Sequence, residues 1–219
     1  MKIDIQKLKN SFKDTPNRTR GDFEAVDGDV KPGPTHRDAA VMILIVPHAK
    51  GYTIVLTKRA EDLPHHPGQV SFPGGKVEDA DTSICDTALR ETQEELGIDP
   101  KDVDIIGTLD TYITRTGFKI TPVVAMAKGP LTYTPDPSEV DAVFELPISL
   151  LMNPDSITHE KKDFKGQTYR FVSWEYDGFR IWGATAFMLK NLTEHLEAQC
   201  PPKTKTPIKT PPLQKKRYK

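Results

Sequence analysis

This sequence lacks long apolar runs and a recognisable secretion signal, and it contains few cysteines. Its longest apolar stretch, residues 39–47, has the length of a strand, whereas a membrane-spanning helix needs about 20 apolar residues. The N-terminus, MKIDIQKLKN, scatters charges among its few apolar residues, unlike a signal peptide. Two cysteines, Cys85 and Cys200, are too few for a disulfide scaffold and fit a reducing compartment. We therefore expect a cytoplasmic protein with no membrane partner.

Acidic residues are absent from the last twenty positions, which sets that segment apart from the rest of the chain. Residues 200–219 hold seven of the 30 Lys and Arg side chains. The other 23 basic residues stand against 31 acidic ones, so residues 1–199 carry a formal charge of about −8. An acidic body suits an enzyme that uses a divalent metal and argues against a general nucleic-acid binder. Any nucleic-acid contact is expected only at the basic tail.

The 219 residues divide into three regions, of which one is long enough for an ordinary domain. Residues 1–35 form an N-terminal extension with a weak helical pattern (Ile5, Leu8, Phe12) and then a Gly/Pro-rich stretch. Residues 36–198 hold nearly all the strong periodicity and form the predicted domain. Residues 199–219 are basic, carry five prolines and have almost no apolar content. We predict that this tail is disordered, because it cannot bury enough apolar surface to offset its ordering entropy.

Within the domain, the hydrophobic patterning predicts an irregular alternation of strands and helices. Gly97 and Pro100 mark the end of the first predicted helix. Because strands and helices interleave without a regular βαβ repeat, we expect a mixed α+β (α/β-class) fold in which a mixed sheet lies between helices. The predicted strands are 39–47, 52–58, 69–72, 103–114, 120–127, 140–146 and 168–176, and the predicted helices are 82–96, 147–152 and 183–196.

Three glutamates share one face of the predicted helix 82–96. At 100° per residue, Glu91, Glu94 and Glu95 fall within roughly one 100° sector. Carboxylates at this spacing repel one another unless a positive charge lies among them. A hard divalent cation is one such neutraliser, and Mg²⁺ binds a few carboxylates together with substrate phosphates. The neighbouring Arg90 could orient a glutamate by charge-assisted hydrogen bonds.

On its own, such a face more often indicates a solvated surface than a metal site. The preceding segment, Phe72-Pro73-Gly74-Gly75, favours the metal site. Glycines at a strand end let the backbone turn sharply and bring a carbonyl close to a ligand. A strand, a Gly-Gly turn, a loop and an acidic helix together predict a small pocket lined by oxygen atoms.

These residues resemble the Nudix box, in which a glycine, five residues, a glutamate and seven residues precede Arg-Glu-aliphatic-x-Glu-Glu-x-Gly-aliphatic. Asp81 stands in place of the first glutamate, with eight residues before Arg90, which leaves a helix N-cap as its simpler role. Thr92 replaces an aliphatic residue, a change that concerns packing. The resemblance implies an α/β/α sandwich with a mixed β-sheet and pyrophosphohydrolase activity. The matching residues are Gly75 and Arg90-Glu91-Thr92-Gln93-Glu94-Glu95-Leu96-Gly97-Ile98.

A second resemblance concerns the substrate and, with the box, covers about residues 38–196. Segments before and after the box are similar to the Nudix subfamily that hydrolyses coenzyme A, whose members also tend to share the one-residue expansion of the box. This similarity implies cleavage of coenzyme A, or its derivatives, to 3′,5′-ADP and 4′-phosphopantetheine. The segments are Leu56-Thr57-Lys58-Arg59, then Leu63, His66 and Gly68-Gln69-Val70-Ser71-Phe72-Pro73-Gly74-Gly75, and later Ile181-Trp182-Gly183-Ala184-Thr185-Ala186.

The Nudix resemblance also assigns roles to the helix. It implies that Glu91, Glu94 and Glu95 hold Mg²⁺ (or Mn²⁺), helped by the carbonyl of Gly74 or Gly75. Glu91 is our first choice for the group that accepts a proton from the attacking water. Arg90 would orient these carboxylates.

Residues outside the helix are candidates for the remaining roles. The family often recruits one further acid, and we favour Glu139 over Glu145 as this metal ligand; an ordinary surface glutamate is the competing interpretation. Arg59, with Lys58, is a candidate for substrate phosphates, and His66 and Gln69 are candidates for other substrate contacts. Trp182 is expected in the core, with adenine stacking as the alternative.

Other functions use the same residues. A Nudix hydrolase acting on ADP-ribose, dinucleotides or capped RNA is the nearest alternative, and the resemblance to the coenzyme A subfamily at Leu63, His66 and Gly68, with their spacing intact, favours coenzyme A. A non-catalytic Nudix module that binds nucleotides or RNA through the basic tail is a further alternative. The retained glutamates argue against it, because a binding module has no need of three clustered negative charges. The sequence leaves open whether the protein forms a homodimer.

Overall fold

The computed structural model describes residues 3–14, 18–24, 36–164 and 167–197. The predicted disordered tail, residues 199–219, lies outside this range. The elements in chain order are α1 Ile5–Asp14, β1 Thr19–Gly21, β2 Arg37–His48, β3 Gly51–Arg59, β4 Val70–Ser71, β5 Gly74–Lys76, α2 Ile84–Leu96, η1 Pro100–Asp102, β6 Val103–Thr108, β7 Thr111–Ile113, β8 Phe118–Ala127, β9 Val140–Pro147, α3 Ile148–Leu151, η2 Pro154–Ser156, β10 Thr158–Phe164, β11 Gln167–Tyr176, β12 Phe179–Ile181 and α4 Gly183–Glu197.

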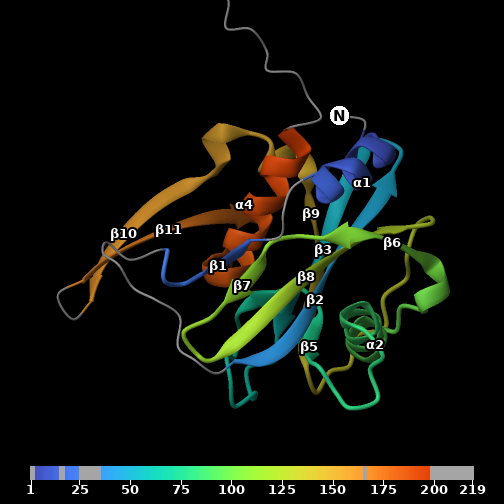
Figure 1. The fold of residues 1–219 in the computed structure, drawn as a ribbon, viewed down its shortest axis with the longest axis horizontal. Coiled ribbons are helices and arrows are strands. Elements are labelled where there is room, and N and C mark those ends of the chain that lie inside the picture. Colours follow the sequence, from blue (N-terminus) through green and yellow to red (C-terminus); the bar gives the residue numbers. More distant parts are fainter. Residues whose placement is uncertain (1–2, 15–17, 25–35, 165–166, 198–219) are drawn as a thin grey trace, which may run out of the picture.

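A mixed sheet forms the middle layer of the molecule (Figure 1). Its main order is β1-β7-β8-β2-β3-β4, and β5, β6 and β9 pair with β2, β8 and β3. β2 runs parallel to β8 and antiparallel to β3 and β5. Strand β2 is a nearly continuous apolar run, as expected of a strand buried on both faces.

Each face of the sheet packs against helices. Ile43 and Ile45 of β2 belong to one core cluster, which also contains residues of α1 and α4. Met42 and Leu44 point to the opposite face and join Ala88 of α2. The alternation of β2 side chains therefore places α2 on one side of the sheet and α1 with α4 on the other. The predicted α/β/α sandwich with a mixed sheet is confirmed.

The N-terminal residues that the structure describes pack onto this sandwich. Leu8 of α1 is fully buried, and Ile3 joins the same core cluster. Strand β1 pairs in parallel with β7. The weak helical pattern in the first residues therefore corresponds to a real helix.

Several boundaries differ from the sequence predictions. The single strand predicted at 103–114 is two strands, β6 and β7, and the β6–β8 register shifts between Ile105 and Gly107. Strands β10 and β12 were not predicted. In β10 the residues between Thr158 and Phe164 are all charged or polar, so no apolar alternation reveals it. Trp182, predicted in the core, is 43% exposed, because it follows β12 at the surface.

The described residues contain no helix that is both long and apolar enough to cross a membrane.

Candidate active site

A strand and a helix that meet side by side build the site. The Gly-Gly segment, predicted as a turn, is itself strand β5, whose residues Gly74 and Gly75 pair with β2. Gly74 has a φ of 153°, and a Cβ there would collide with the backbone of Ala40 and Val41. A Cβ on Gly75 would collide with the carboxylate of Glu91. Gly74 therefore needs glycine, and a side chain at Gly75 would displace the Glu91 carboxylate, so the two glycines let β5 approach β2 and α2 closely.

Helix α2 begins two residues later than predicted. Its N-cap is Ser83, whose hydroxyl accepts a hydrogen bond from the Asp86 N–H at 3.2 Å. The interpretation of Asp81 as the N-cap is therefore wrong. At the other end, Gly97 adopts a left-handed conformation with a φ of 68° and caps the helix as predicted.

Glu95 is the most deeply placed of the helix glutamates. Its side chain points at β5, where Oε1 accepts a hydrogen bond from the Gly74 N–H at 3.2 Å. The residue is only 3% exposed. Burial raises the pKa of the Glu95 carboxyl to about 8, although the Gly74 hydrogen bond and the charge of Arg59 oppose this shift. Burial also raises the pKa of the Glu91 carboxyl, against the effect of Arg90.

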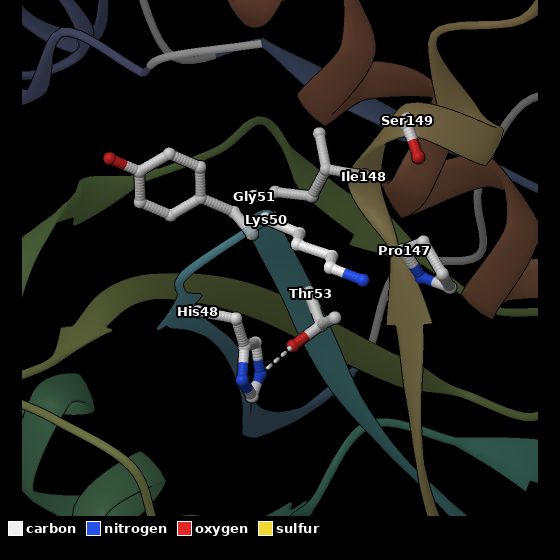
Figure 2. A pocket seen from close by; sticks show the side chains of 8 residues that line it. His48, Lys50, Gly51, Thr53, Pro147, Ile148 and Ser149 are labelled. Carbon is white, nitrogen blue, oxygen red and sulfur yellow. Dashed lines mark hydrogen bonds between the residues drawn. The ribbon is translucent and has the colours of Figure 1, made fainter.

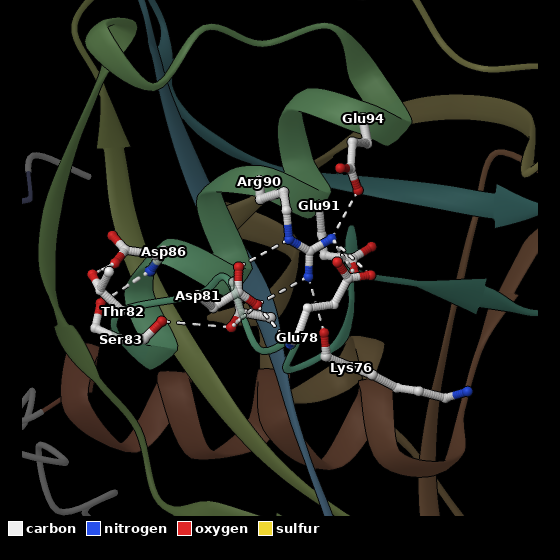
Figure 3. Close-up of polar contacts among 10 residues, drawn as sticks. Lys76, Glu78, Asp81, Thr82, Ser83, Asp86, Arg90, Glu91 and Glu94 are labelled. Atoms are coloured by element: carbon white, nitrogen blue, oxygen red, sulfur yellow. Dashed lines mark hydrogen bonds and ion pairs between the residues drawn. The ribbon is translucent and has the colours of Figure 1, made fainter.

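Arg90 connects the box residues to one another (Figure 3). Its Nε and Nη2 donate to the two carboxylate oxygens of Asp81 at 3.0 and 3.1 Å. Its Nη1 donates to Glu91 Oε1 at 3.0 Å and to Glu94 Oε2 at 2.9 Å. A further bond from Nη2 reaches the Lys76 carbonyl at 3.0 Å. The guanidinium thus links two helix glutamates to the loop before the helix.

Asp81 anchors this arrangement. Besides the fork from Arg90, it accepts hydrogen bonds from the Thr87 hydroxyl at 2.8 Å and the Glu78 N–H at 2.9 Å. These bonds, with that from Arg90 the strongest, hold the pKa of Asp81 well below its usual range. The one-residue expansion of the box therefore still places a carboxylate against Arg90, a role that sequence spacing did not reveal.

Replacing Asp81 with alanine is expected to lower kcat roughly tenfold, the lower end of what residues supporting a metal site contribute. The reason is that Arg90 would lose the bidentate partner that fixes it beside Glu91 and Glu94. Steady-state kinetics against Asp86→Ala provides a matched control, because Asp86 lies at the same helix end but does not contact Arg90. Equal rates for both variants would show that Asp81 only shapes the loop.

The two candidate acids from outside the helix lie in different places. Glu139 is close enough for its charge to raise the pKa of both Glu91 and Glu95. Its carbonyl accepts the Ala60 N–H at 2.9 Å, just beyond β3. Glu145 instead bonds His48, Thr53 and Tyr133 at the far end of β3. Of the two, only Glu139 lies beside the helix glutamates.

The candidate substrate residues gather where β3 ends and β4 begins. The Arg59 N–H donates to the Gln69 carbonyl at 3.0 Å, and the charge of Arg59 acts on Glu95. The His66 ring lies 3.1 Å from Gln69 Oε1. Lys58, in contrast, is held in ion pairs with acidic side chains, Asp141 at 2.7 Å and Glu61 at 2.9 Å. Arg59 is thus the cation nearer the acidic helix.

The acidic side chains suit a hard divalent ion in their chemistry. In the described part of the chain, no three acidic, histidine or cysteine side chains converge closely enough to hold an ion as they stand. Glu91 and Glu94 instead bond Arg90. Glu95, however, is a buried carboxylate with no cationic group within ion-pair distance among the described residues. Burial disfavours the charged form of this carboxyl unless a cation compensates it, and carboxylate oxygens are the ligands that Mg²⁺ prefers.

A separate cavity of about 280 Å³ lies at the turn of the β2–β3 hairpin (Figure 2). His48, Lys50 and Thr53 line it from the hairpin, with Pro147 and Ser149 opposite. The acidic helix contributes no residue to it.

Comparisons with known proteins agree with this geometry. Residues 34–174 match the NUDIX domain family. The "Uncharacterized Nudix hydrolase NudL" of Escherichia coli is 39% identical over 158 residues, covering 72% of this chain and 81% of that protein. The protein of the same name from Cronobacter sakazakii is 40% identical over 157 residues, covering 71% and 81%. A crystal structure of a Nudix hydrolase from M. smegmatis, RenU, superposes with a TM-score of 0.52 at 19% identity, covering 80% of this chain and 97% of that one. The chain belongs to the Nudix family and is a pyrophosphohydrolase of nucleoside diphosphate derivatives.

Proposed function

We propose that this enzyme hydrolyses the pyrophosphate bond of coenzyme A, or of its derivatives, to 3′,5′-ADP and 4′-phosphopantetheine. The observation that carries the proposal is the meeting of two signature segments at the acidic helix. Arg59 closes the first segment and Gln69 follows Gly68 near the start of the second, and a backbone hydrogen bond of 3.0 Å joins Arg59 to Gln69. The second segment runs on into Gly74, which bonds Glu95. The segments that resemble the coenzyme A subfamily thus end beside the proposed metal site.

Glu91, Glu94 and Glu95 would hold Mg²⁺ or Mn²⁺, together with Glu139 and a carbonyl of Gly74 or Gly75. The chemistry supplied by a bound divalent ion is neutralisation of pyrophosphate oxygens and acidification of water. On binding, Glu91 and Glu94 would exchange some of their bonds to Arg90 for the ion, while Asp81 keeps the guanidinium in place.

Glu91 is proposed as the proton acceptor for the attacking water. Its pKa is raised by burial, which improves a carboxylate as a base. Arg90 and Glu139 flank it with charges of opposite sign, and both act on its pKa. Arg59, His66 and Gln69 would bind the substrate, with Arg59 meeting phosphate oxygens.

Incubation with coenzyme A and Mg²⁺ or Mn²⁺, followed by mass analysis of the products, tests the proposal. We expect 3′,5′-ADP and 4′-phosphopantetheine in equal amounts, and neither product when a chelator is present. ADP-ribose, a dinucleotide and capped RNA serve as competing substrates. Rapid turnover of one of these, with no 3′,5′-ADP from coenzyme A, would move the enzyme to another Nudix specificity.

A further inference from the structure

The loop from β8 to β9 is docked onto the C-terminal end of α2. The Thr134 N–H donates to the Leu96 carbonyl at 2.8 Å, and the Asp136 N–H donates to the Glu95 carbonyl at 3.0 Å. These two carbonyl groups belong to the last turn of the helix, where no intrahelical partner remains. The loop thus supplies hydrogen-bond donors to the last carbonyl groups of α2, and these bonds hold it beside Glu95.

Asp136 then begins a single tight turn that ends at Glu139. Its carboxylate accepts the Ser138 N–H at 2.8 Å and the Ser138 hydroxyl at 2.7 Å. Its carbonyl accepts the N–H groups of Glu139 at 3.0 Å and Val140 at 2.9 Å. The sequence Asp136-Pro137-Ser138-Glu139 has the order of a helix start, with an acidic N-cap, proline next and glutamate third.

Two features make this turn stiff. Pro135 and Pro137 stand on either side of Asp136 and fix their own φ angles, which reduces the freedom of the unfolded loop. At its far end, the Glu139 carbonyl accepts the Ala60 N–H at 2.9 Å, which ties the turn to the end of β3. The backbone of Glu139 is therefore set by bonds to two elements, α2 through Asp136 and β3 through Ala60.

The turn presents Glu139 to the acidic face of α2. The Glu139 carboxylate raises the pKa of both Glu91 and Glu95, so it lies within electrostatic reach of each. Such an approach of like charges is unfavourable unless the fold imposes it. The described residues place no cationic side chain within ion-pair distance of Glu139 that would offset this cost.

We propose that Asp136 is a positioning residue, which holds Glu139 against the metal-binding face of α2 before the metal arrives. The inference rests on the proposed role of Glu139 as a metal ligand. Asp136 does not touch the metal. It acts by making the turn that carries Glu139, and it thereby lowers the ordering cost of recruiting this carboxylate.

The test measures Mn²⁺ affinity by titration in the absence of substrate. Asp136→Ala removes both bonds to Ser138 and is expected to weaken Mn²⁺ binding roughly tenfold. Asp136→Asn retains an oxygen acceptor and is expected to restore most of the affinity. Asp99→Ala is the matched control, because Asp99 also follows α2 and also accepts a hydrogen bond from the N–H two residues later, at 2.9 Å to Lys101. That variant is expected to bind Mn²⁺ like the wild type.

A double-mutant cycle with Glu139→Gln shows whether Asp136 affects metal binding through Glu139. If Asp136 acts through Glu139, adding Asp136→Ala to Glu139→Gln will weaken Mn²⁺ binding no further. Wild-type affinity in Asp136→Ala, or in Glu139→Gln, would overturn the proposal. Circular dichroism reports folding, and Ser138→Ala, which removes only the hydroxyl donor, replaces Asp136→Ala if that variant does not fold. Failure to cleave coenzyme A would leave these affinities unchanged, so the two proposals fail separately.

Discussion

Replacing Glu94 or Glu95 with glutamine is expected to lower kcat at least about 100-fold, the scale of one preorganised electrostatic group. Phosphoryl transfer depends mostly on positioning and charge. Removing one carboxylate from the proposed metal site should therefore remove most of the rate enhancement that the metal supplies. Glutamine has nearly the same size and helix propensity, and its carbonyl oxygen can still accept the Gly74 N–H that Glu95 now binds. The loss should therefore appear in catalysis while helix α2 stays intact.

Steady-state kinetics with saturating Mg²⁺ checks this expectation. Glu175→Gln is a suitable control, because Glu175 lies in β11 and pairs with Arg180, away from the helix. Near-normal rates in both α2 variants would mean that this acidic face is an ordinary surface and that the proposed site is misplaced.

The parts of the site that lie close together in sequence were predictable. Helix α2 follows from its 3.6-residue period and from Gly97, whose left-handed conformation ends it. Glu91, Glu94 and Glu95 share a face because spacings of three and four residues bring side chains together on any helix. The glycines before the helix were predicted to allow a close approach, although they do so inside a strand and not in a turn.

The parts that depend on distant segments were not predictable. Spacing alone could not show that Asp81, one residue out of register, still reaches Arg90 with both carboxylate oxygens. The sequence offered only the position of Glu139 at the entry to a strand as a reason to favour it over Glu145. In the structure the two residues lie at opposite ends of β3, with Glu139 at the end near α2. Asp136 had a readable signal, the Asp-Pro-Ser-Glu start of a turn, but its partner on α2 appears only when the chain is folded.

The buried carboxylate of Glu95 is expected to make the metal-free protein less stable as the pH rises. The pKa of Glu95 is about 8 in the folded protein, above the value of 4.5 for an exposed glutamate. Below about pH 4.5 the carboxyl is protonated in both states and contributes no difference. Between these values the unfolded chain loses its proton while the folded protein keeps it, so the free energy of unfolding falls. Above about pH 8 the loss is complete and constant.

The size of this effect makes it measurable. One pKa unit corresponds to about 1.4 kcal/mol, so even half of the shift would cost on the order of 2 kcal/mol at pH 8. We expect Glu95→Gln to remove most of this loss, and thus to be more stable than the wild type at pH 8 and similar to it at pH 4.5. Denaturant unfolding with a chelator, at several pH values between 4.5 and 9, measures the difference. Parallel pH profiles for the two proteins would contradict a raised pKa at Glu95.

Divalent metal should offset this loss of stability in the wild type. An ion that binds only the folded state stabilises it by about 2.7 kcal/mol at one hundred times its dissociation constant. Because Glu95 is the most buried of the proposed ligands, the wild type should gain this stabilisation from Mn²⁺ at pH 8, and Glu95→Gln should gain much less. The same carboxylate would then weaken the empty protein and strengthen the loaded one, as expected of a group kept for metal binding and not for packing. Equal stabilisation of both proteins by Mn²⁺ would place the ion elsewhere.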